Sequence, residues 1–424
     1  MPDSSPNSLG WKKLFDKFPI EKEVGTSGIY RLTAKQINTF GQREARLMTK
    51  FDSRARRPKL LLESRITILP VTNGEYLLLK GDGYCDVPTP QKVDTYSASR
   101  LTEMQTLPWR SGIRGESQAI DIMFMASILR TFTGDPDLQL TLRGRLGSRK
   151  FSFYFKTEIR RETINVDGVT IELDSGFEGR TIVLLEAKFR TIDSFIIRQL
   201  YYPLRDLMAA NVTKTITPVL LVYSNKVFSL YSFVFRDLES YNSIELVRQA
   251  NYSLDERKPL PTLSDLLTRR RRSAPDGVPF PQADDISKVF DVTEILTAGP
   301  ADKEQIAERF DVDPRQGDYY GNAAAWLGLA EKSHTSFQLS KDGRVFALMN
   351  RSDRIAWLSQ RLFEMPVFRE ASEAFVRGDP LNDQEIARLI ARTARLSGST
   401  LPRRAATTRA WVNWMAHELK PNPS

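Results

Sequence analysis

Cysteine and histidine are almost absent from this chain of 424 residues. Cys85 is the single cysteine, so no intramolecular disulfide can form, and we expect a reducing, cytoplasmic compartment. The two histidines, His334 and His417, are too few for a zinc finger. The same count excludes a His-based metal nuclease and a phosphodiesterase built on paired His-Lys motifs.

Two further absences concern the membrane and the cofactor. No apolar run reaches the length of about 18 residues that a transmembrane helix needs, and residues 1–15 lack the apolar centre of a signal peptide. No GxxxxGK[ST] phosphate loop occurs, so no nucleotide cofactor is expected. The sequence therefore predicts a cytoplasmic protein without a membrane span.

Positive charge is in excess, with a formal net charge of +9 at pH 7 and a sequence pI near 9.4. This balance favours a polyanionic partner such as DNA, and a basic protein without such a partner is the alternative. Hydrophobic residues make up 41% of the chain and charged residues 27%. The composition is that of a globular protein with about two or three domains.

Charged residues interrupt two β-like runs between Val169 and Phe189. Asp174 ends the first run, and Glu186 and Lys188 lie inside the second, after a turn that contains glycine. Residues i and i+2 of a strand share a face, so Glu186 and Lys188 should project together towards Asp174. Two carboxylates and one ammonium at a sheet edge can hold a divalent cation and activate a water, as a hydrolytic nuclease requires.

The alternative interpretation of Glu186 and Lys188 is an ordinary ion pair near a strand end. Burying a charge is costly unless the charge is paired or bound to a metal. Asp174 lies 12 residues before Glu186, across a turn, and this placement favours the functional interpretation.

An aspartate, a short spacer and Glu-x-Lys on a strand together resemble the pattern of the PD-(D/E)xK nuclease superfamily. The wider sequence resembles type II restriction endonucleases of one subfamily over roughly residues 20–240, with a further match in the C-terminal region. The matching segments are Gly115–Phe124, Leu140–Arg145, Glu172–Gly179, Leu184–Phe189 and Arg198–Arg205.

The resemblance implies a role for each matching residue. Asp174 and Glu186 would bind the metal, and Glu116 would be an accessory acid beside it. Lys188 would position or deprotonate the attacking water.

One departure from the superfamily pattern concerns the first carboxylate. Leu173 precedes Asp174 where the pattern has a loosely kept proline, so Glu172 is an alternative to Asp174. Glu172 and Asp174 are i and i+2 on one strand, and facing alone does not choose between them. We prefer Asp174, because it lies nearer the turn and its spacing to Glu186 suits the pattern.

The function that the resemblance implies is hydrolysis of double-stranded DNA at a specific short sequence by a Mg²⁺-dependent type II restriction endonuclease. The products would carry 5′-phosphate and 3′-hydroxyl ends. Cutting both strands needs two active sites, so symmetry predicts a homodimer. The alternatives are a non-catalytic DNA-binding regulator and a structure-specific repair nuclease of the same superfamily.

Changes in composition and in predicted secondary structure divide the chain into four parts. We expect an N-terminal α+β module over 1–110, a nuclease core over 111–257, a basic linker rich in Pro and Gly over 258–283, and a winged-helix domain with a helical extension over 284–424. The predicted fold class is α/β of mixed α+β type, with a central mixed sheet flanked by helices.

Periodicity predicts the main elements of the first two parts. The N-terminal module should contain a helix over Ala34–Phe51 and two strands within Leu60–Lys80, joined at Asn73-Gly74. The core should begin with one long helix over Ser117–Phe132 and end with a helix over 194–210 and two strands. The two strands after that helix are expected at Thr217–Tyr223 and Val227–Phe235, and four earlier strands near Gln139–Arg143, Phe151–Lys156, Val169–Asp174 and Thr181–Phe189.

Two basic segments are candidates for contact with the DNA backbone. Arg54, Arg56 and Arg57 form the first, for which a solvated basic loop is the alternative. The run Arg269–Arg272 forms the second, either as a strap across phosphates or as a solvated hinge.

Helices over Asp285–Thr297, Lys303–Phe310 and Pro314–Leu327, followed by a two-stranded hairpin, give a winged-helix pattern. The third helix of such a domain can enter the major groove, although many winged helices bind protein instead. Arg, Asn and Gln suit bidentate contacts with bases. The polar candidates on this helix are Arg315, Gln316, Tyr319, Tyr320 and Asn322.

Overall fold

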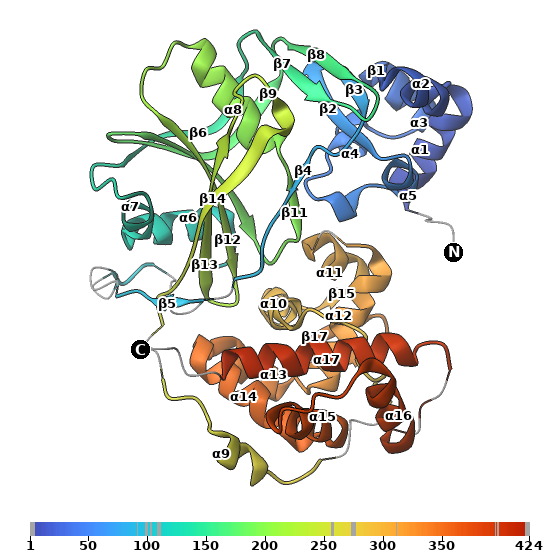
Figure 1. The fold of residues 1–424 in the computed structure, drawn as a ribbon, viewed down its shortest axis with the longest axis vertical. Coiled ribbons are helices and arrows are strands. Elements are labelled where there is room, and N and C mark those ends of the chain that lie inside the picture. Colours follow the sequence, from blue (N-terminus) through green and yellow to red (C-terminus); the bar gives the residue numbers. More distant parts are fainter. Residues whose placement is uncertain are drawn as a thin grey trace.

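The computed structural model describes residues 5–90, 92–97, 101, 104–107, 112–255, 258–272, 277–310, 312–394, 396 and 398–419. Figure 1 shows three bodies: an N-terminal module in blue, a central twisted sheet in green to yellow, and a helical C-terminal domain in orange and red. The expected mixed α+β class with a central sheet flanked by helices is confirmed.

The central sheet has seven strands in the order β5-β14-β13-β12-β10-β9-β6. The pairs β10/β12 and β14/β5 are parallel, and the other neighbours are antiparallel. The strands are β5 (Asp94–Thr95), β6 (Gln139–Gly147), β9 (Thr170–Glu178), β10 (Ile182–Phe189), β12 (Ile216–Ser224), β13 (Val227–Phe235) and β14 (Ile244–Ser253). Short β11 (Ser194–Ile196) pairs outside this sheet with β4 (Tyr84–Asp86).

Helices cover both faces of β10, which explains its apolar run. Val183 and Leu185 pack in the cluster under α6 (Glu116–Met125) and α7 (Ile128–Thr133). Leu184 packs on the other side, with α8 (Arg198–Ala209) and the hairpin of β7 (Phe151–Lys156) and β8 (Arg161–Val166). Because alternate residues of a strand face opposite ways, Glu186 and Lys188 follow Leu184 onto the α8 side.

Two predicted helices are each divided in the structure. The helix expected over Ser117–Phe132 is α6 and α7, separated at Ser127, which has a left-handed φ of 64°. The helix expected over Ala34–Phe51 is α3 (Ala34–Gly41) and α4 (Ala45–Thr49), separated at Gln42 with φ 56°. Apolar spacing persists across both breaks, so periodicity alone could not locate them.

Apart from several strands of two or three residues, β8 and β14 were not predicted from the sequence. β8 pairs with β7 in a hairpin, and β14 lies between β13 and the short β5. Much of each strand is exposed, so neither carries the apolar run of a buried strand. The segment predicted as one helix over 194–210 begins instead with β11 and continues as α8.

The N-terminal module packs helices against the three-stranded sheet β1-β3-β2. The predicted hairpin at Asn73-Gly74 is confirmed, and Gly74 has the positive φ of 110° that favours glycine. Its elements are α1 (Pro6–Lys17), α2 (Ile20–Ser27), β1 (Ile29–Thr33), α3, α4, the 3₁₀ turn η1 (Arg54–Arg56), α5 (Lys59–Glu63), β2 (Ile66–Thr72) and β3 (Glu75–Lys80).

The segment between α4 and η1 is fixed against the core. The Ile196 backbone N–H donates to the Asp52 carbonyl at 2.9 Å, and the Arg54 N–H donates to Ser194 Oγ at 3.0 Å. The Tyr84 hydroxyl donates to the Phe51 carbonyl at 2.9 Å. These contacts place Asp52 beside the C-terminal end of β10.

The C-terminal domain contains the predicted three helices and hairpin. These are α10 (Ile286–Leu296), α11 (Lys303–Phe310), α12 (Pro314–Trp326), β16 (Ala330–Ser333) and β17 (Ser336–Leu339), with β15 (Ala301–Asp302) as a third strand. Further helices pack around them, namely α13 (Lys341–Leu348), α14 (Arg351–Glu364), α15 (Pro366–Val376), α16 (Asp383–Thr393) and α17 (Leu401–Glu418). The predicted linker carries α9 (Leu263–Leu267).

Buried polar contacts join this domain to the core. Arg354 of α14 is fully buried, and its Nη1 donates to Asn225 Oδ1 of the core at 3.4 Å and to Glu294 Oε1 of α10 at 2.8 Å. Asp291 Oδ2 accepts from the Ser224 hydroxyl at 2.7 Å. Burial raises the pKa of Asp291 to about 7, and Arg190 opposes the rise.

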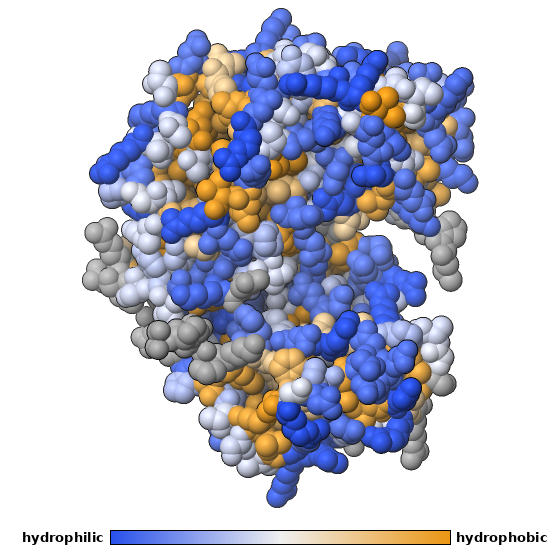
Figure 2. Space-filling view, viewed as in Figure 1, coloured by the Kyte–Doolittle hydropathy of each residue, from blue (hydrophilic) through white to orange (hydrophobic). Residues whose placement is uncertain are grey.

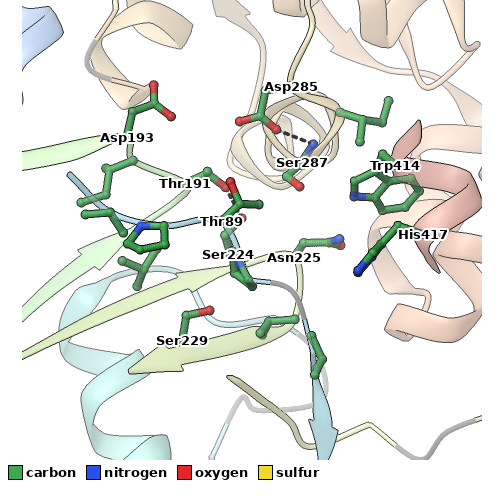
Figure 3. Close-up of a pocket in the computed structure, with 18 of the residues that line it drawn as sticks. Thr89, Thr191, Asp193, Ser224, Asn225, Ser229, Asp285, Ser287, Trp414 and His417 are labelled. Carbon is green, nitrogen blue, oxygen red and sulfur yellow. Dashed lines mark hydrogen bonds between the residues drawn. The ribbon is translucent and has the colours of Figure 1, made fainter. Parts of the chain in front are cut away.

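A cavity of about 310 Å³ remains between the core and the C-terminal domain. Figure 3 shows Ser224 and Asn225 of the core on one side of it, with Asp285, the N-cap residue of α10, and Trp414 and His417 of α17 on the others. Its lining of hydroxyl, amide and acidic groups shows that the domains meet through polar as well as apolar surface.

The visible face of the molecule is largely hydrophilic (Figure 2). On the face shown in Figure 2, apolar residues form scattered patches. Among the described residues, no helix combines the length and apolar character that crossing a bilayer requires.

The close packing of α12 on α11 gives a stability prediction. A Cβ on Gly317 would lie 2.2 Å from the Lys303 carbonyl oxygen, so Gly317→Ala must push the two helices apart. We expect a loss of about 1–3 kcal/mol in the free energy of unfolding, measured by urea denaturation. Gly25→Ala in α2 is the matched control, because nothing lies within 4 Å of its added Cβ. That change should stabilise by about 0.5–1 kcal/mol.

Candidate active site

The charged pair on β10 is buried on the α8 side of the sheet. Lys188 Nζ lies 2.7 Å from Glu186 Oε1, and the two side chains are 13% and 6% exposed. Gln199 Nε2, from the first turn of α8, donates to the same Glu186 oxygen. The amide oxygen of Gln199, Oε1, is buried and has no hydrogen-bond partner among the described residues.

Asp174 reaches this pair from β9. The ladder between β9 and β10 ends at the pair Ser175 and Leu185. Beyond that pair, Asp174 Oδ2 accepts a hydrogen bond of 2.8 Å from the Ala187 N–H, between Glu186 and Lys188 in the chain. The side chain of Asp174 thus takes the place of a ladder bond and lies at the point where the strands diverge.

The alternative first carboxylate, Glu172, has different partners. It forms ion pairs with Arg46, Lys50 and Arg145 at 3.3, 2.8 and 2.9 Å. Asp174, rather than Glu172, therefore contacts the backbone between Glu186 and Lys188.

Two further carboxylates approach Lys188. Glu116 begins α6 at the mouth of the cleft, where its carboxylate accepts a hydrogen bond from the Phe189 backbone. Asp52 comes from the N-terminal module, and its Oδ1 is inaccessible to water and accepts no hydrogen bond from the described residues. Glu116 was predicted from the resemblance, whereas no pattern in the sequence pointed to Asp52.

The pKa shifts record an excess of negative charge around one ammonium. Burial alone would lower the pKa of Lys188, but Glu186, Asp52 and Glu116 outweigh burial and raise it. Burial raises the pKa of Glu186 to about 8, with Lys188 opposing and Asp174 adding to the rise. Burial also raises the pKa of Glu116. For Asp52, burial alone would raise the pKa, but nearby cations, Lys188 foremost, outweigh it and lower the pKa.

A cleft of about 540 Å³ opens beside these groups. All three bodies of the fold contribute to its walls, and Arg56 Nη2 donates to the Glu308 carbonyl of α11 at 2.9 Å. The cleft is lined by Asp52, Arg56, Gly115, Glu116, Lys188, Phe189, Ile192, Glu308 and Arg309.

The donor set fits a hard cation that keeps several waters. Within the described parts of the chain, no three His, Cys, Asp or Glu side chains are close enough to share an ion. Mg²⁺ is usually held by one or two carboxylates, with water completing the octahedron. Asp174 and Glu186 would be those carboxylates. Burial, with a smaller contribution from the charge of Asp174, raises the pKa of Glu186, and a bound cation would favour its ionised form.

The basic segment 54–57 is mostly occupied with internal contacts. Arg54 pairs with Asp82 and Asp86 at 2.9 and 2.6 Å. Arg57 is buried and donates to the Ile66 carbonyl at 3.0 Å. These contacts correct the expectation that both arginines face the DNA backbone, and only Arg56 of the three lines the cleft.

Two of the residues proposed to read bases are turned inward. Tyr320 and Asn322 on α12 are 6% and 7% exposed. The Asn322 amide donates to Asp318 Oδ2 at 2.8 Å. The expectation that these two residues face a groove is therefore wrong for this conformation, because the helices packed around α12 cover them.

The other three candidates on α12 are more accessible. Arg315 is exposed and its Nε donates to the Tyr319 hydroxyl, and Gln316 is half-buried. Arg403 from α17 lies over the Tyr319 ring, 4.4 Å from its centroid. The helical extension thus shares this surface with α12.

The arginine run in the linker rests on α14. Arg269 and Arg272 pair with Glu364 at 3.2 and 3.6 Å, and the Arg272 N–H donates to the Glu364 carbonyl at 2.7 Å. This part of the linker is thus held on α14, while all four arginines of the run stay exposed to solvent.

Three segments match families that are each described as a domain of unknown function. They are residues 8–78 (DUF6996), 79–253 (DUF6997) and 288–420 (DUF7226). No curated protein and no solved structure matches the chain. The second segment contains Glu116, Asp174, Glu186 and Lys188, whereas Asp52 lies in the first, so the cluster draws on two of these families.

The buried carboxylates predict how stability depends on pH. Glu186 has a pKa of about 8 in the fold against an ordinary value of 4.5, so between these values the folded chain holds a proton that the unfolded chain has lost. The free energy of unfolding should therefore fall as pH rises from 5 to 8, by at most about 1.4 kcal/mol per pH unit for this group. Lys188 stays charged throughout and adds no slope there.

Urea denaturation at several pH values checks this prediction. Glu186→Gln should flatten the fall, because it removes the titrating group. Asp291→Asn should remove a second, smaller part of the fall in the free energy of unfolding. The reason is that the pKa of Asp291 is also raised, to about 7. An unchanged slope in Glu186→Gln would contradict the assignment.

Proposed function

We propose that this chain is a Mg²⁺-dependent endonuclease that hydrolyses double-stranded DNA at a specific short sequence, of the type II restriction class. The observation that carries the proposal is the convergence of Asp174, Glu186 and Lys188 where β9 and β10 diverge, with Lys188 opening on a cleft. The net charge of +9 supports a polyanionic substrate.

The charge state of Lys188 defines its role in the reaction. Its pKa is raised, so the ammonium remains protonated at neutral pH and cannot accept a proton from water. It is suited instead to orient a water molecule and to stabilise negative charge that develops on the phosphate. Of the two roles that the resemblance left open, this favours positioning over deprotonation.

The neighbouring carboxylates would bind the metal and accept a proton. Bound at Asp174 and Glu186, a divalent cation supplies polarisation of the phosphate and a lower pKa for a bound water. Glu116, at the mouth of the cleft with a raised pKa, is suited to accept the proton that the attacking water releases. In-line attack would leave 5′-phosphate and 3′-hydroxyl ends, and a homodimer would place two such sites on the duplex.

The rival proposal is a DNA-binding regulator without catalysis. One observation favours it: Glu186 already has Lys188 and Gln199 as partners, so the pair could be purely structural. A structure-specific repair nuclease would share the site and differ in cutting without a fixed sequence. Mapping the ends of digested DNA separates discrete from scattered cut positions.

Cleavage of unmethylated phage DNA tests the catalytic assignment. Asp174→Asn and Lys188→Met should each lower the rate by about 10²–10³-fold or more, because each removes a charge that acts at the reacting phosphate. Asp167→Asn is the control, since it makes the same change in an exposed ion pair with Lys150. That variant should cut at the wild-type rate.

The opposite pattern would support the regulator. If wild-type protein binds duplex DNA with no cleavage at any Mg²⁺ or Mn²⁺ concentration, the nuclease proposal fails. Equal activity in wild type and Lys188→Met would also contradict it.

Metal binding should displace a proton from the site. At pH 7 Glu186, with a pKa of about 8, is mostly protonated, and a cation can bind its carboxylate only after deprotonation. Calorimetric titration with Mg²⁺ in buffers of different ionisation enthalpy should show release of nearly one proton at pH 7 and little release at pH 9. Glu186→Gln should lose the release, and proton release that persists in this variant would place the metal elsewhere.

A further inference from the structure

Three cations meet a single carboxylate on β9. Glu172 pairs with Arg46 and Lys50 of the N-terminal module and with Arg145 of β6, at 3.3, 2.8 and 2.9 Å. One negative charge cannot neutralise three positive ones, so the group carries a formal excess of +2. These cations, led by Lys50, lower the pKa of Glu172 against a smaller opposing effect of burial.

The group lies in a cavity rather than on a flat surface. The cavity has a volume of about 330 Å³ and lies between the N-terminal module and β9. Arg198 at the start of α8 also lines it, which adds a fourth cation. The side chains of Glu172 and Lys50 are 40% and 39% exposed, so an anion in solution can reach them.

Three chain segments join this cavity to the candidate active site. Glu172 lies two residues before Asp174 on β9, and Lys50 lies two residues before Asp52. Arg198 directly precedes Gln199, which donates to Glu186. Two residues of a strand span about 6.7 Å, which is comparable to the separation of neighbouring phosphates on one nucleic-acid strand.

We propose that this cavity binds the phosphate group that neighbours the scissile phosphate on the same nucleic-acid strand. The proposal rests on the proposed function for the position of the scissile phosphate. Glu172 occupies the anion position in the free protein and holds Arg46, Lys50 and Arg145 in place. When nucleic acid binds, the phosphate takes over these cations.

The chemistry of the cavity matches a phosphate. Guanidinium groups of Arg46 and Arg145 present planar pairs of donors that suit phosphate oxygens, and Lys50 adds a compact charge. An internal phosphodiester and a terminal 5′-phosphate share this chemistry. Both sources are therefore compared in the test.

The test asks whether removing the charge of Glu172 strengthens or weakens binding of duplex DNA. In a Lys188→Met background without divalent metal, a further Glu172→Gln change should tighten binding of a duplex with hydroxyl ends by about fivefold, because a repelling charge is removed. Lys50→Gln and Arg145→Gln should each weaken binding, and the slope of log affinity against log salt should shrink by about one per lost contact.

A matched control exists on the same strand. Glu178 on β9 is 42% exposed and pairs with one cation, Lys214, at 2.6 Å. Glu178→Gln removes the same charge at the far end of β9 and should leave affinity within about twofold of the parent. Thermal unfolding of each variant checks that the fold is retained.

The outcomes separate the source of the phosphate and the two proposals. A gain in Glu172→Gln with hydroxyl-ended duplex assigns an internal phosphodiester, and a gain only with 5′-phosphorylated ends assigns a terminal phosphate. If Glu172→Gln binds both duplexes no more tightly than its parent, the phosphate site is overturned, while loss of cleavage in Asp174→Asn would still support the nuclease. Tighter binding by a protein that never cuts would support the phosphate site and reject the nuclease.

Discussion

The buried ammonium of Lys188 is the interaction on which the rest of the site depends. Asp52, Glu116 and Glu186 come from different parts of the fold, and burial opposes their charged forms. One cation lowers the cost of bringing them together but does not neutralise them all. The remaining negative charge makes the cluster a place where a cation is favoured, and it keeps Lys188 protonated.

Charge is distributed unevenly on either side of this cluster. The carboxylates gather where β9 and β10 diverge, whereas Arg46, Lys50, Arg145 and Arg198 gather around Glu172 only two residues away. In the proposed nuclease, the excess of negative charge would favour a metal and the adjoining excess of positive charge would favour a phosphate. The N-terminal module contributes to both, which gives it a direct part in the site.

The C-terminal domain is tied to the strand that carries the cluster. Arg190 directly follows β10, is buried with a left-handed φ of 110°, and lies 3.6 Å from Glu294 of α10. Such a backbone is costly for a residue other than glycine, so the contacts around it must hold it in place. The same domain supplies Glu308 and Arg309 to the cleft wall, so its position sets the width of the entrance.

Local pattern determined much of this protein: the strand with Glu186 and Lys188, the hairpin at Asn73-Gly74, and the three helices and wing of the C-terminal domain. These features follow from the alternation, turn residues and helical spacing of neighbouring residues, which a sequence displays directly. Only the tertiary structure decided that Asp52 joins the cluster, that Tyr320 and Asn322 turn inward, and that Glu172 gathers cations rather than accompanying Asp174. Each of these depends on which distant surfaces pack together, and that is set by the burial of whole faces rather than by any local run of residues.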